Sequence, residues 1–273
     1  MREYIFEIPE SREELLTVQL TESGFTSFYF EKSGQKNFLK IYLRDNDLPA
    51  ILLNETPISS SDVDPSSWSR VWGENYNGSE LTENIFILPS GVTPPDKKYK
   101  TIIEIDPFDS FGDGHHPTTR LCGMLLEEIL NGGNNAASLS MLDIGTGSGI
   151  LSIAAWIMGI KNIDLFDYDS VAVEKASKNL KLNGINSLSP FTDDIYKFTS
   201  DKKYDIITAN LLSRLIEDNM IKLISLLKPE GKIIVSGIST KWTEQMKKVF
   251  SANGFQIIKH RVLEEWNGFI LEF

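Results

Sequence analysis

Hydrophobic and polar residues alternate at two different periods from Leu139 to the end of the chain. Short apolar runs, typical of buried strands, are separated by segments in which apolar residues recur at the spacing of an amphipathic helix. The predicted strands are 141–144, 163–166, 191–192, 206–209, 233–236, 256–262 and 269–273. This alternation of strands and helices predicts a mostly parallel sheet that is covered by helices on both faces.

The last two predicted strands follow each other too closely for a helical crossover. Only residues 263–268 lie between them, whereas the connection between two parallel strands needs roughly a dozen residues. We therefore predict that these two strands form an antiparallel hairpin at the edge of the sheet.

A second and shorter pattern occupies the beginning of the chain. Strands are predicted at 4–8, 26–31 and 38–43, with a helix at 11–22. The stretch that follows is rich in Ser, Asp and Pro, which is typical of a connector between two cores. We predict a small α+β domain over 1–58, a linker and connecting segment over 59–95, and a larger domain over 96–273.

The connecting region carries an aromatic pattern and the first of two further strands. Trp68, Trp72 and Tyr76 recur every four residues, so we expect one side of a short helix to pack between the domains. Strands are predicted at 85–88 and 101–105, on either side of a Pro-Pro turn, and they lead into the larger domain.

Three glycines at alternate positions follow the strand predicted at 141–144. Gly145, Gly147 and Gly149 would permit a sharp turn into a helix and a close approach of the backbone to a ligand. A dinucleotide fingerprint places its last glycine at the sixth position of this pattern, where the chain has Ile150. The spacing instead resembles the loop of Rossmann-like S-adenosylmethionine-dependent methyltransferases. A tight turn with no ligand is the alternative.

A carboxylate follows the glycines at a second predicted strand end. Asp167 comes 22 residues after Gly145, close to the offset of about 20 residues at which a βαβ unit places an acidic side chain against a ribose. Asp169, two residues further on, is predicted to cap the next helix, because Asp at this position satisfies free backbone N–H groups.

Composition restricts the partners that we expect. The chain has 38 acidic and 27 basic residues and a net charge of -11, which favours a basic partner and disfavours stable nucleic-acid binding. It has no long apolar stretch and no apolar leader after Met1, so we expect a cytoplasmic protein without a membrane span. Cys122, the single cysteine, fits the interior of a helix, and we expect no metal site.

Motifs on both sides of the glycines resemble one known family. They are FGDGHHPTTR at 111–120, TANLL at 208–212, Trp68-x-x-x-Trp72, and LPS at 88–90. Together they are similar to the bacterial ribosomal protein L11 methyltransferase family, in which a small substrate-recognition domain precedes a class I catalytic domain. The resemblance covers the chain from Trp68 onward.

The resemblance implies both a fold and an activity. The implied fold is α/β, a Rossmann-like class I methyltransferase sheet with an antiparallel C-terminal hairpin, preceded by a small α+β, ferredoxin-like domain. The implied activity is S-adenosylmethionine-dependent methylation of lysine side chains and of the N-terminal amine of a basic protein of the large ribosomal subunit, L11. We expect a monomer.

Matching motif positions imply the residues of the cofactor site. The implied contacts of S-adenosylmethionine are Thr119, Gly145, Asp167 and Asn210, with Gly147 and Gly149 completing the loop. Asn210, at a strand end, is also expected to orient the incoming amine, because its amide donates and accepts without carrying charge. Capping of a helix is the alternative role for Thr119, and satisfaction of a turn is the alternative for Asn210.

Two positions near this site stay open. Asp193 and Asp194 both follow the third strand, where related enzymes hold the adenine amino group, and we predict Asp194 without separating the two. The family has threonine where this chain has Asp113, which leaves cofactor binding expected and puts the protein substrate in doubt. An RNA or small-molecule methyltransferase and a non-catalytic cofactor-binding module are the alternative functions.

Overall fold

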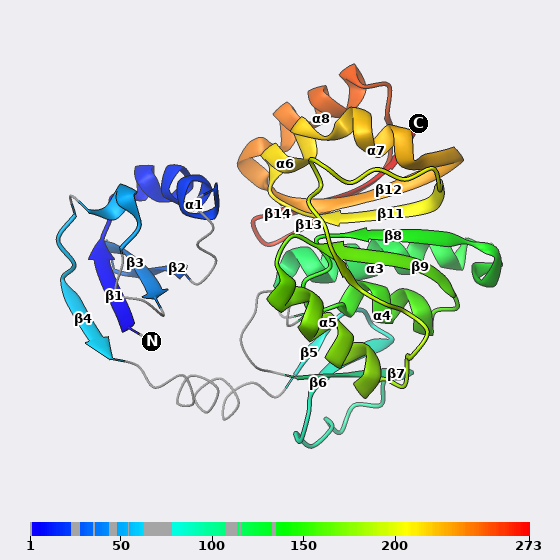
Figure 1. The fold of residues 1–273 in the computed structure, drawn as a ribbon, viewed down its shortest axis with the longest axis horizontal. Coiled ribbons are helices and arrows are strands. Elements are labelled where there is room, and N and C mark those ends of the chain that lie inside the picture. Colours follow the sequence, from blue (N-terminus) through cyan, green and yellow to red (C-terminus); the bar gives the residue numbers. More distant parts are fainter. Residues whose placement is uncertain are drawn as a thin grey trace. The chain divides into compact units, whose positions relative to one another are not determined.

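The computed structural model consists of two compact units, Met1–Glu74 and Asn75–Phe273 (Figure 1). It describes residues 2–22, 28–34, 36–43, 48–53, 55–62, 78–106, 114, 116–132 and 135–273. The buried apolar residues form three clusters, and within the described residues none of these clusters mixes the two units. Each unit therefore has a hydrophobic core of its own.

The first unit is an antiparallel sheet with the strand order β2-β3-β1-β4. Its elements are β1 (Arg2–Glu7), η1 (Glu10–Arg12), α1 (Glu13–Glu22), β2 (Phe28–Ser33), β3 (Lys36–Leu43), η2 (Ala50–Leu52) and β4 (Ser59–Asp62). Leu16 and Leu20 of α1 pack with Phe6 and Leu39 of the sheet. A ferredoxin-like βαββαβ pattern has a second helix before its last strand, and in that place the described residues contain only the short η2.

Strand β4 differs from the sequence prediction. We predicted residues 59–95 as a linker and connecting segment, yet β4 pairs with β1 at the edge of the first sheet, with Ser59 opposite Ile5. All four residues of β4 are exposed. Backbone hydrogen bonds to β1 therefore hold this strand in place, and a hydrophobic pattern could not have revealed it.

The second unit is built on a sheet with the order β10-β9-β8-β11-β12-β14-β13. The strands are β8 (Ser140–Ile144), β9 (Asn162–Asp167), β10 (Phe191–Thr192), β11 (Tyr204–Asn210), β12 (Leu227–Ser239), β13 (Gln256–Leu263) and β14 (Trp266–Glu272). Neighbours from β10 to β12 are parallel, and β14 is antiparallel to both β12 and β13. The predicted parallel sheet and its antiparallel hairpin at the edge are confirmed.

Alternate strand residues point into two different layers, because successive side chains of a strand face opposite sides of a sheet. One face of the sheet packs with α6 (Ser213–Asp218), α7 (Met220–Leu226) and α8 (Thr243–Ala252). The other packs with α3 (Pro117–Asn131) and α4 (Ile150–Ile157), beside which α5 (Ser170–Leu182) lies. Figure 1 shows these two groups of helices on opposite sides of the strands. Helices thus cover both faces, as predicted.

A small second sheet completes this unit. Its strands are β5 (Ser79–Glu80), β6 (Ile85–Pro89) and β7 (Thr101–Ile105), in that order. Leu81, Ile87 and Ile103 are buried in the same cluster as α3 and α4. Residues 79–89, which we predicted to lie in the connecting segment, therefore belong to the core of the second unit.

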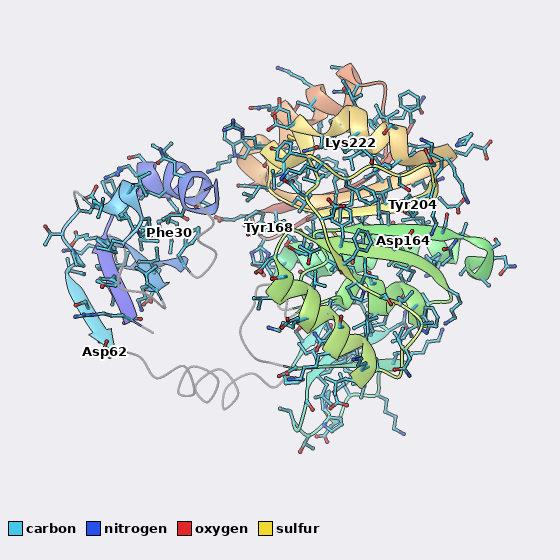
Figure 2. All side chains as sticks on the ribbon, in the orientation of Figure 1. Phe30, Asp62, Asp164, Tyr168, Tyr204 and Lys222 are labelled. Carbon is cyan, nitrogen blue, oxygen red and sulfur yellow. The ribbon has the colours of Figure 1, made fainter. Side chains whose placement is uncertain are left out.

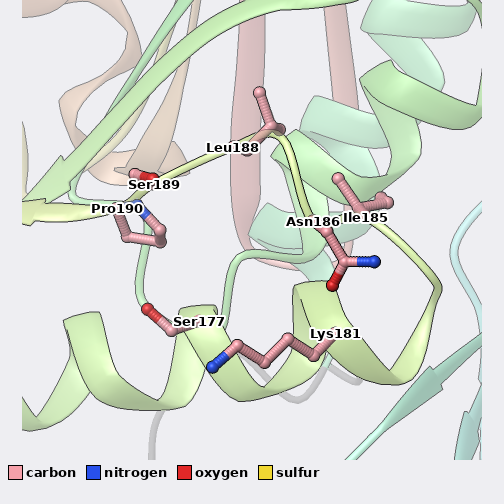
Figure 3. Close-up of a pocket in the computed structure, with 7 residues that line it drawn as sticks. All are labelled: Ser177, Lys181, Ile185, Asn186, Leu188, Ser189 and Pro190. Carbon is pink, nitrogen blue, oxygen red and sulfur yellow. The ribbon is translucent and has the colours of Figure 1, made fainter.

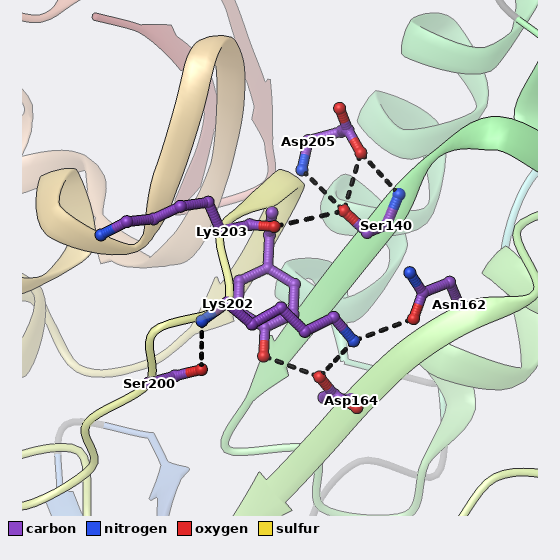
Figure 4. A network of polar contacts seen from close by, with 8 residues as sticks. Ser140, Asn162, Asp164, Ser200, Lys202, Lys203 and Asp205 are labelled. Carbon is purple, nitrogen blue, oxygen red and sulfur yellow. Dashed lines mark hydrogen bonds and ion pairs between the residues drawn. The ribbon is translucent and has the colours of Figure 1, made fainter.

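Polar side chains join the beginnings of the parallel strands (Figure 4). Asp205 of β11 accepts hydrogen bonds from the backbone N–H and the hydroxyl of Ser140, both at 2.7 Å, and from the Lys228 ammonium at 2.7 Å. Nearby, Asp164 of β9 accepts hydrogen bonds from Lys202 and from the Tyr204 hydroxyl at 2.6 and 2.7 Å (Figure 2). These contacts stabilise the amino-terminal ends of the parallel strands. The candidate site described below lies at their carboxyl ends.

The Asp205 cluster makes stability depend on pH. Burial alone would raise the pKa of the Asp205 carboxyl, but hydrogen bonds from Lys228 and Ser140 outweigh burial and lower the pKa below its ordinary value. A carboxyl whose folded pKa is lowered stabilises the protein above the ordinary pKa and loses that contribution as the pH falls through the folded pKa.

We expect Asp205→Asn to reduce the free energy of unfolding by about 1–2 kcal/mol at neutral pH, because the amide cannot reproduce the ionic hydrogen bonds. The difference between the two proteins should shrink below about pH 4, where the wild-type carboxyl itself becomes neutral. Urea unfolding at a series of pH values measures it, and a difference that stays constant across the series would contradict the assignment.

Candidate cofactor site

The glycines form a loop between β8 and α4 whose backbone conformation favours glycine at three positions. Gly145, Gly147 and Gly149 have φ angles of 67°, 55° and 82°, in the left-handed region that strains other residues. A Cβ on Gly145 would lie 2.6 Å from Leu211 Cδ2, and one on Gly149 would lie 3.2 Å from the Ala176 Cβ of α5. The sharp turn is therefore present, and it is packed closely on both sides.

Asp143 of β8, two residues before Gly145, anchors this loop from inside the protein. Its carboxylate accepts hydrogen bonds from the hydroxyls of Thr146 and Ser152, both at 2.7 Å, and of Thr208 at 2.6 Å. The side chain is 1% exposed, and burial raises its pKa although the three hydroxyls act in the opposite direction. No sequence pattern marks this role of Asp143, because its hydroxyl partners lie in the loop, in α4 and in β11.

Asp167 lies at the end of β9, directly beside the glycine loop. One carboxylate oxygen accepts the Gly147 N–H at 2.9 Å, and the other accepts the Asp169 N–H at 3.1 Å. Burial raises the pKa of this carboxyl, and the two backbone N–H groups lower it. Each carboxylate oxygen has a second lone pair, so Asp167 can accept further hydrogen bonds from a ligand. Asp169 caps α5 by accepting from Val171 N–H at 2.9 Å, as predicted.

The two candidate aspartates for the adenine end lie after β10, which pairs with β9. The Asp193 N–H donates to the Asp167 carbonyl at 3.0 Å, so this segment is adjacent to the ribose candidate. The Asp194 carboxylate accepts the Tyr196 N–H at 2.9 Å and faces Lys197 at 3.7 Å. The geometry brings both aspartates to the site without choosing between them.

Thr119 and Asn210 meet although they are 91 residues apart in the sequence. The Asn210 side-chain N–H at the end of β11 donates to the Thr119 hydroxyl of α3 at 3.4 Å. His116, and not Thr119, is the N-terminal cap of α3, since its ring nitrogen accepts the Thr118 N–H. The capping role that we considered for Thr119 is therefore wrong, and its hydroxyl is turned toward the strand ends of the sheet.

Gly237 packs against the backbone of Leu211, the residue that follows β11. No sequence pattern marked Gly237 for this role. Its φ is 85°, and a Cβ on Gly237 would lie 2.1 Å from the Leu211 carbonyl oxygen. It lies in β12 at a register shift against β14, where glycine often permits a bulge. Leu211 is thus enclosed between Gly145 of the glycine loop and Gly237.

Tyr168 is a second feature that sequence analysis did not assign. It follows Asp167, and 57% of its side chain is exposed (Figure 2). An exposed aromatic ring beside a carboxylate that is the candidate for ribose binding can stack on a base.

Several predicted features lie outside the described residues or away from this site. Asp113, His115 and the aromatic residues at 68, 72 and 76 fall outside the described part of the chain. Cys122 is buried in α3, as expected, and burial raises the pKa of its thiol.

Among the described residues, no three His, Cys, Asp or Glu side chains are grouped to hold a metal ion. No helix in that part of the chain is long and apolar enough to cross a membrane.

A surface pocket of about 350 Å³ lies elsewhere, between the second half of α5 and the segment that leads to β10 (Figure 3). Its lining consists of Ser177, Lys181, Ile185, Asn186, Leu188, Ser189 and Pro190. This lining includes none of the predicted site residues, so the pocket is separate from the candidate cofactor site.

Comparisons with known proteins agree with this geometry. A family model described as Ribosomal protein L11 methyltransferase (PrmA) matches residues 3–272. The ribosomal protein L11 methyltransferase of Geobacillus thermodenitrificans is 35% identical over 219 residues, which is 80% of this chain and 69% of that protein. The protein of the same name from Anoxybacillus flavithermus is 34% identical over the same length.

Solved structures agree as well. The crystal structure of ribosomal protein L11 methylase from Lactobacillus delbrueckii subsp. bulgaricus superposes with a TM-score of 0.65 at 30% identity, covering 72% of this chain and 98% of that one. A putative methyltransferase complexed with SAH superposes with a TM-score of 0.50 at 15% identity, covering 61% of this chain and 52% of that one. The second likeness concerns the fold alone.

Proposed function

The chain belongs to the ribosomal protein L11 methyltransferase family, and we propose that it transfers methyl groups from S-adenosylmethionine to amines of ribosomal protein L11. The accepting groups in this proposal are lysine side chains, the N-terminal amine, or both. The observation that carries it is the convergence of Gly145, Asp167 and the Thr119–Asn210 pair at the carboxyl ends of neighbouring strands, where open α/β sheets bind ligands.

The residues present suit this cofactor. The glycine loop offers three positions without a side chain, Gly145, Gly147 and Gly149, to the methionine end. Asp167 has lone pairs left for the ribose hydroxyls, and the exposed Tyr168 ring offers a stacking surface to the adenine. Asp194 or Asp193 would accept from the adenine amino group. Position 150, where a dinucleotide fingerprint has its last glycine, is an isoleucine in this chain, which agrees with a ligand that has no pyrophosphate.

Asn210 is the group that we assign to the accepting amine. Bound S-adenosylmethionine would supply a methyl group on a sulfonium. The lone pair of a neutral amine would form the new C–N bond as the C–S bond breaks, leaving S-adenosylhomocysteine and a methylated ammonium that releases its proton to water. Within the described residues the Asn210 amide oxygen accepts no hydrogen bond, while its N–H donates to Thr119, so the oxygen is free to accept from the amine. An uncharged amide orients the amine without stabilising its ammonium form. A carboxylate in the same place would stabilise the ammonium, which cannot accept a methyl group. Positioning then supplies most of the rate enhancement.

The charge of the chain supports a basic protein as the substrate. The net charge is -11, which attracts a basic protein over long range and repels the phosphates of RNA. We assign recognition of the protein substrate to the first unit, because the proposed cofactor residues all belong to the second. The proposal takes the enzyme to be a monomer.

Transfer of labelled methyl groups tests the function directly. The purified protein is incubated with labelled S-adenosylmethionine and with undermethylated large ribosomal subunits or free L11 protein, and proteins and RNA are then separated. Label on L11 is the expected result. Label on RNA would favour an RNA methyltransferase, and cofactor binding without any transfer would favour a non-catalytic module.

Removal of the first unit should separate binding from substrate recognition. A fragment beginning at Asn75 keeps both core clusters of the second unit, so we expect it to bind S-adenosylmethionine like the full chain. Its kcat/KM on L11 should fall by about 100-fold, because remote contacts with the substrate contribute to transition-state stabilisation. Calorimetry and the methyl-transfer assay measure the two quantities, and unimpaired transfer by the fragment would contradict the recognition role.

A further inference from the structure

Two asparagines one turn apart, Asn179 of α5 and Asn183 at its C-cap, connect this helix to strand β7 of the small sheet. The Asn183 side chain accepts the Glu104 N–H at 3.0 Å and donates to the Glu104 carbonyl at 2.6 Å. The Asn179 side chain accepts the Asp106 N–H at 2.9 Å, just after β7 ends. Strand β7 is at the edge of the small sheet. The asparagine side chains thus supply some of the hydrogen bonds that a neighbouring strand would make with its backbone.

Asn179 makes one further contact that Asn183 does not make. Its side-chain N–H donates to the carbonyl of Ser148, within the glycine loop, at 2.8 Å. Asn179 is fully buried, so both polar atoms of its side chain depend on these bonds for their hydrogen-bond partners. A single side chain therefore joins the cofactor loop to the end of β7.

The contact lies where the loop is most constrained. One turn before Asn179, Ala176 approaches the loop so closely that a Cβ on Gly149 would lie 3.3 Å from the Ala176 Cα. The Gly147 N–H donates to Asp167, and the Gly149 N–H donates to the Thr146 carbonyl at 2.9 Å. Asn179 fixes the Ser148 carbonyl, so the 148–149 peptide cannot rotate without breaking this buried hydrogen bond.

We propose that Asn179 is a positioning residue for the cofactor site, which fixes the Ser148 carbonyl and so the path of the glycine loop. Asn183 stabilises the same helix and strand without setting the loop. The inference rests on the proposed function for the identity of the ligand, S-adenosylmethionine. It extends that function to a residue that does not itself contact the ligand.

Asn179→Ala and Asn183→Ala in the full chain form a matched pair. Each removes two long-range hydrogen bonds to backbone groups, and Asn183→Ala also removes the bond to the Asn179 carbonyl at 2.8 Å. We expect each variant to lower Tm by a few degrees, about 3–8 °C. Only Asn179→Ala should weaken S-adenosylmethionine binding, by about 10-fold, with Asn183→Ala staying within about 2-fold of wild type. Thermal unfolding and calorimetric titration measure the two effects.

Asn179→Asp is the second variant, because it preserves shape and the acceptor for the Asp106 N–H. It replaces the donor to Ser148 with a carboxylate oxygen that repels the carbonyl, so we expect the affinity to fall as in Asn179→Ala. Equal affinities in the Asn179 and Asn183 variants would overturn the inference. Wild-type protein that fails to bind S-adenosylmethionine would overturn the proposed function, and the inference with it.

Discussion

Asp167→Ala is expected to weaken S-adenosylmethionine binding by about 100-fold or more and to leave the fold of the second unit intact. In the proposed site the ionised Asp167 carboxylate accepts two hydrogen bonds from the ribose, each worth about 1.5–3 kcal/mol, and the substitution removes both. The Gly147 N–H also loses its acceptor, so the glycine loop loses one of the contacts that hold it. Both effects act in the same direction on affinity.

Asp169→Ala is the matched control for this experiment. It removes the same side chain two residues further on, where the carboxylate accepts the Val171 N–H as the cap of α5. Loss of the cap costs about 1 kcal/mol of stability and no ribose contact, so affinity for the cofactor should stay near that of wild type. Calorimetric titration of both variants decides the matter. Wild-type affinity in Asp167→Ala would remove this carboxylate from the cofactor site.

Local patterns in the sequence predicted the parts of the fold that local physics determines. The alternation of strands and helices predicted the parallel sheet, and the short 263–268 segment predicted the antiparallel hairpin, because connection length limits strand direction. The glycine spacing predicted the turn after β8, since left-handed φ angles belong almost only to glycine.

The features that we did not predict depend on contacts between distant segments. Strand β4 is polar and exposed, and it exists because β1 offers a free edge. Strand β14 lies between β12 and β13, an order that connection length does not determine. Asp143 has a hydroxyl partner in Thr208, 65 residues away, and neither residue shows a sequence signal for the pairing. The role of Gly237 likewise depends on Leu211, which only the fold brings near.

Gly237→Ala is expected to reduce methyl transfer by about 100-fold or more, because it displaces the segment that carries Asn210. The new Cβ would lie 2.1 Å from the Leu211 carbonyl oxygen and 2.7 Å from its carbonyl carbon. Both are backbone atoms, so no side-chain rotation relieves the overlap. Leu211 has to move, and Asn210, the adjacent residue, moves with it.

Gly91→Ala separates this overlap from the strain of the left-handed conformation. Gly91 has a φ of 83°, against 85° at Gly237, and a Cβ there meets nothing within 4 Å. Both variants lose about 1 kcal/mol to the unfavourable φ, whereas only Gly237→Ala also has to displace the backbone. Thermal unfolding and the methyl-transfer assay should therefore show a small loss of stability with full activity for Gly91→Ala, and a larger loss of stability with little activity for Gly237→Ala. Equal activities in the two variants would mean that the end of β11 tolerates displacement, and that Asn210 does not orient the accepting amine.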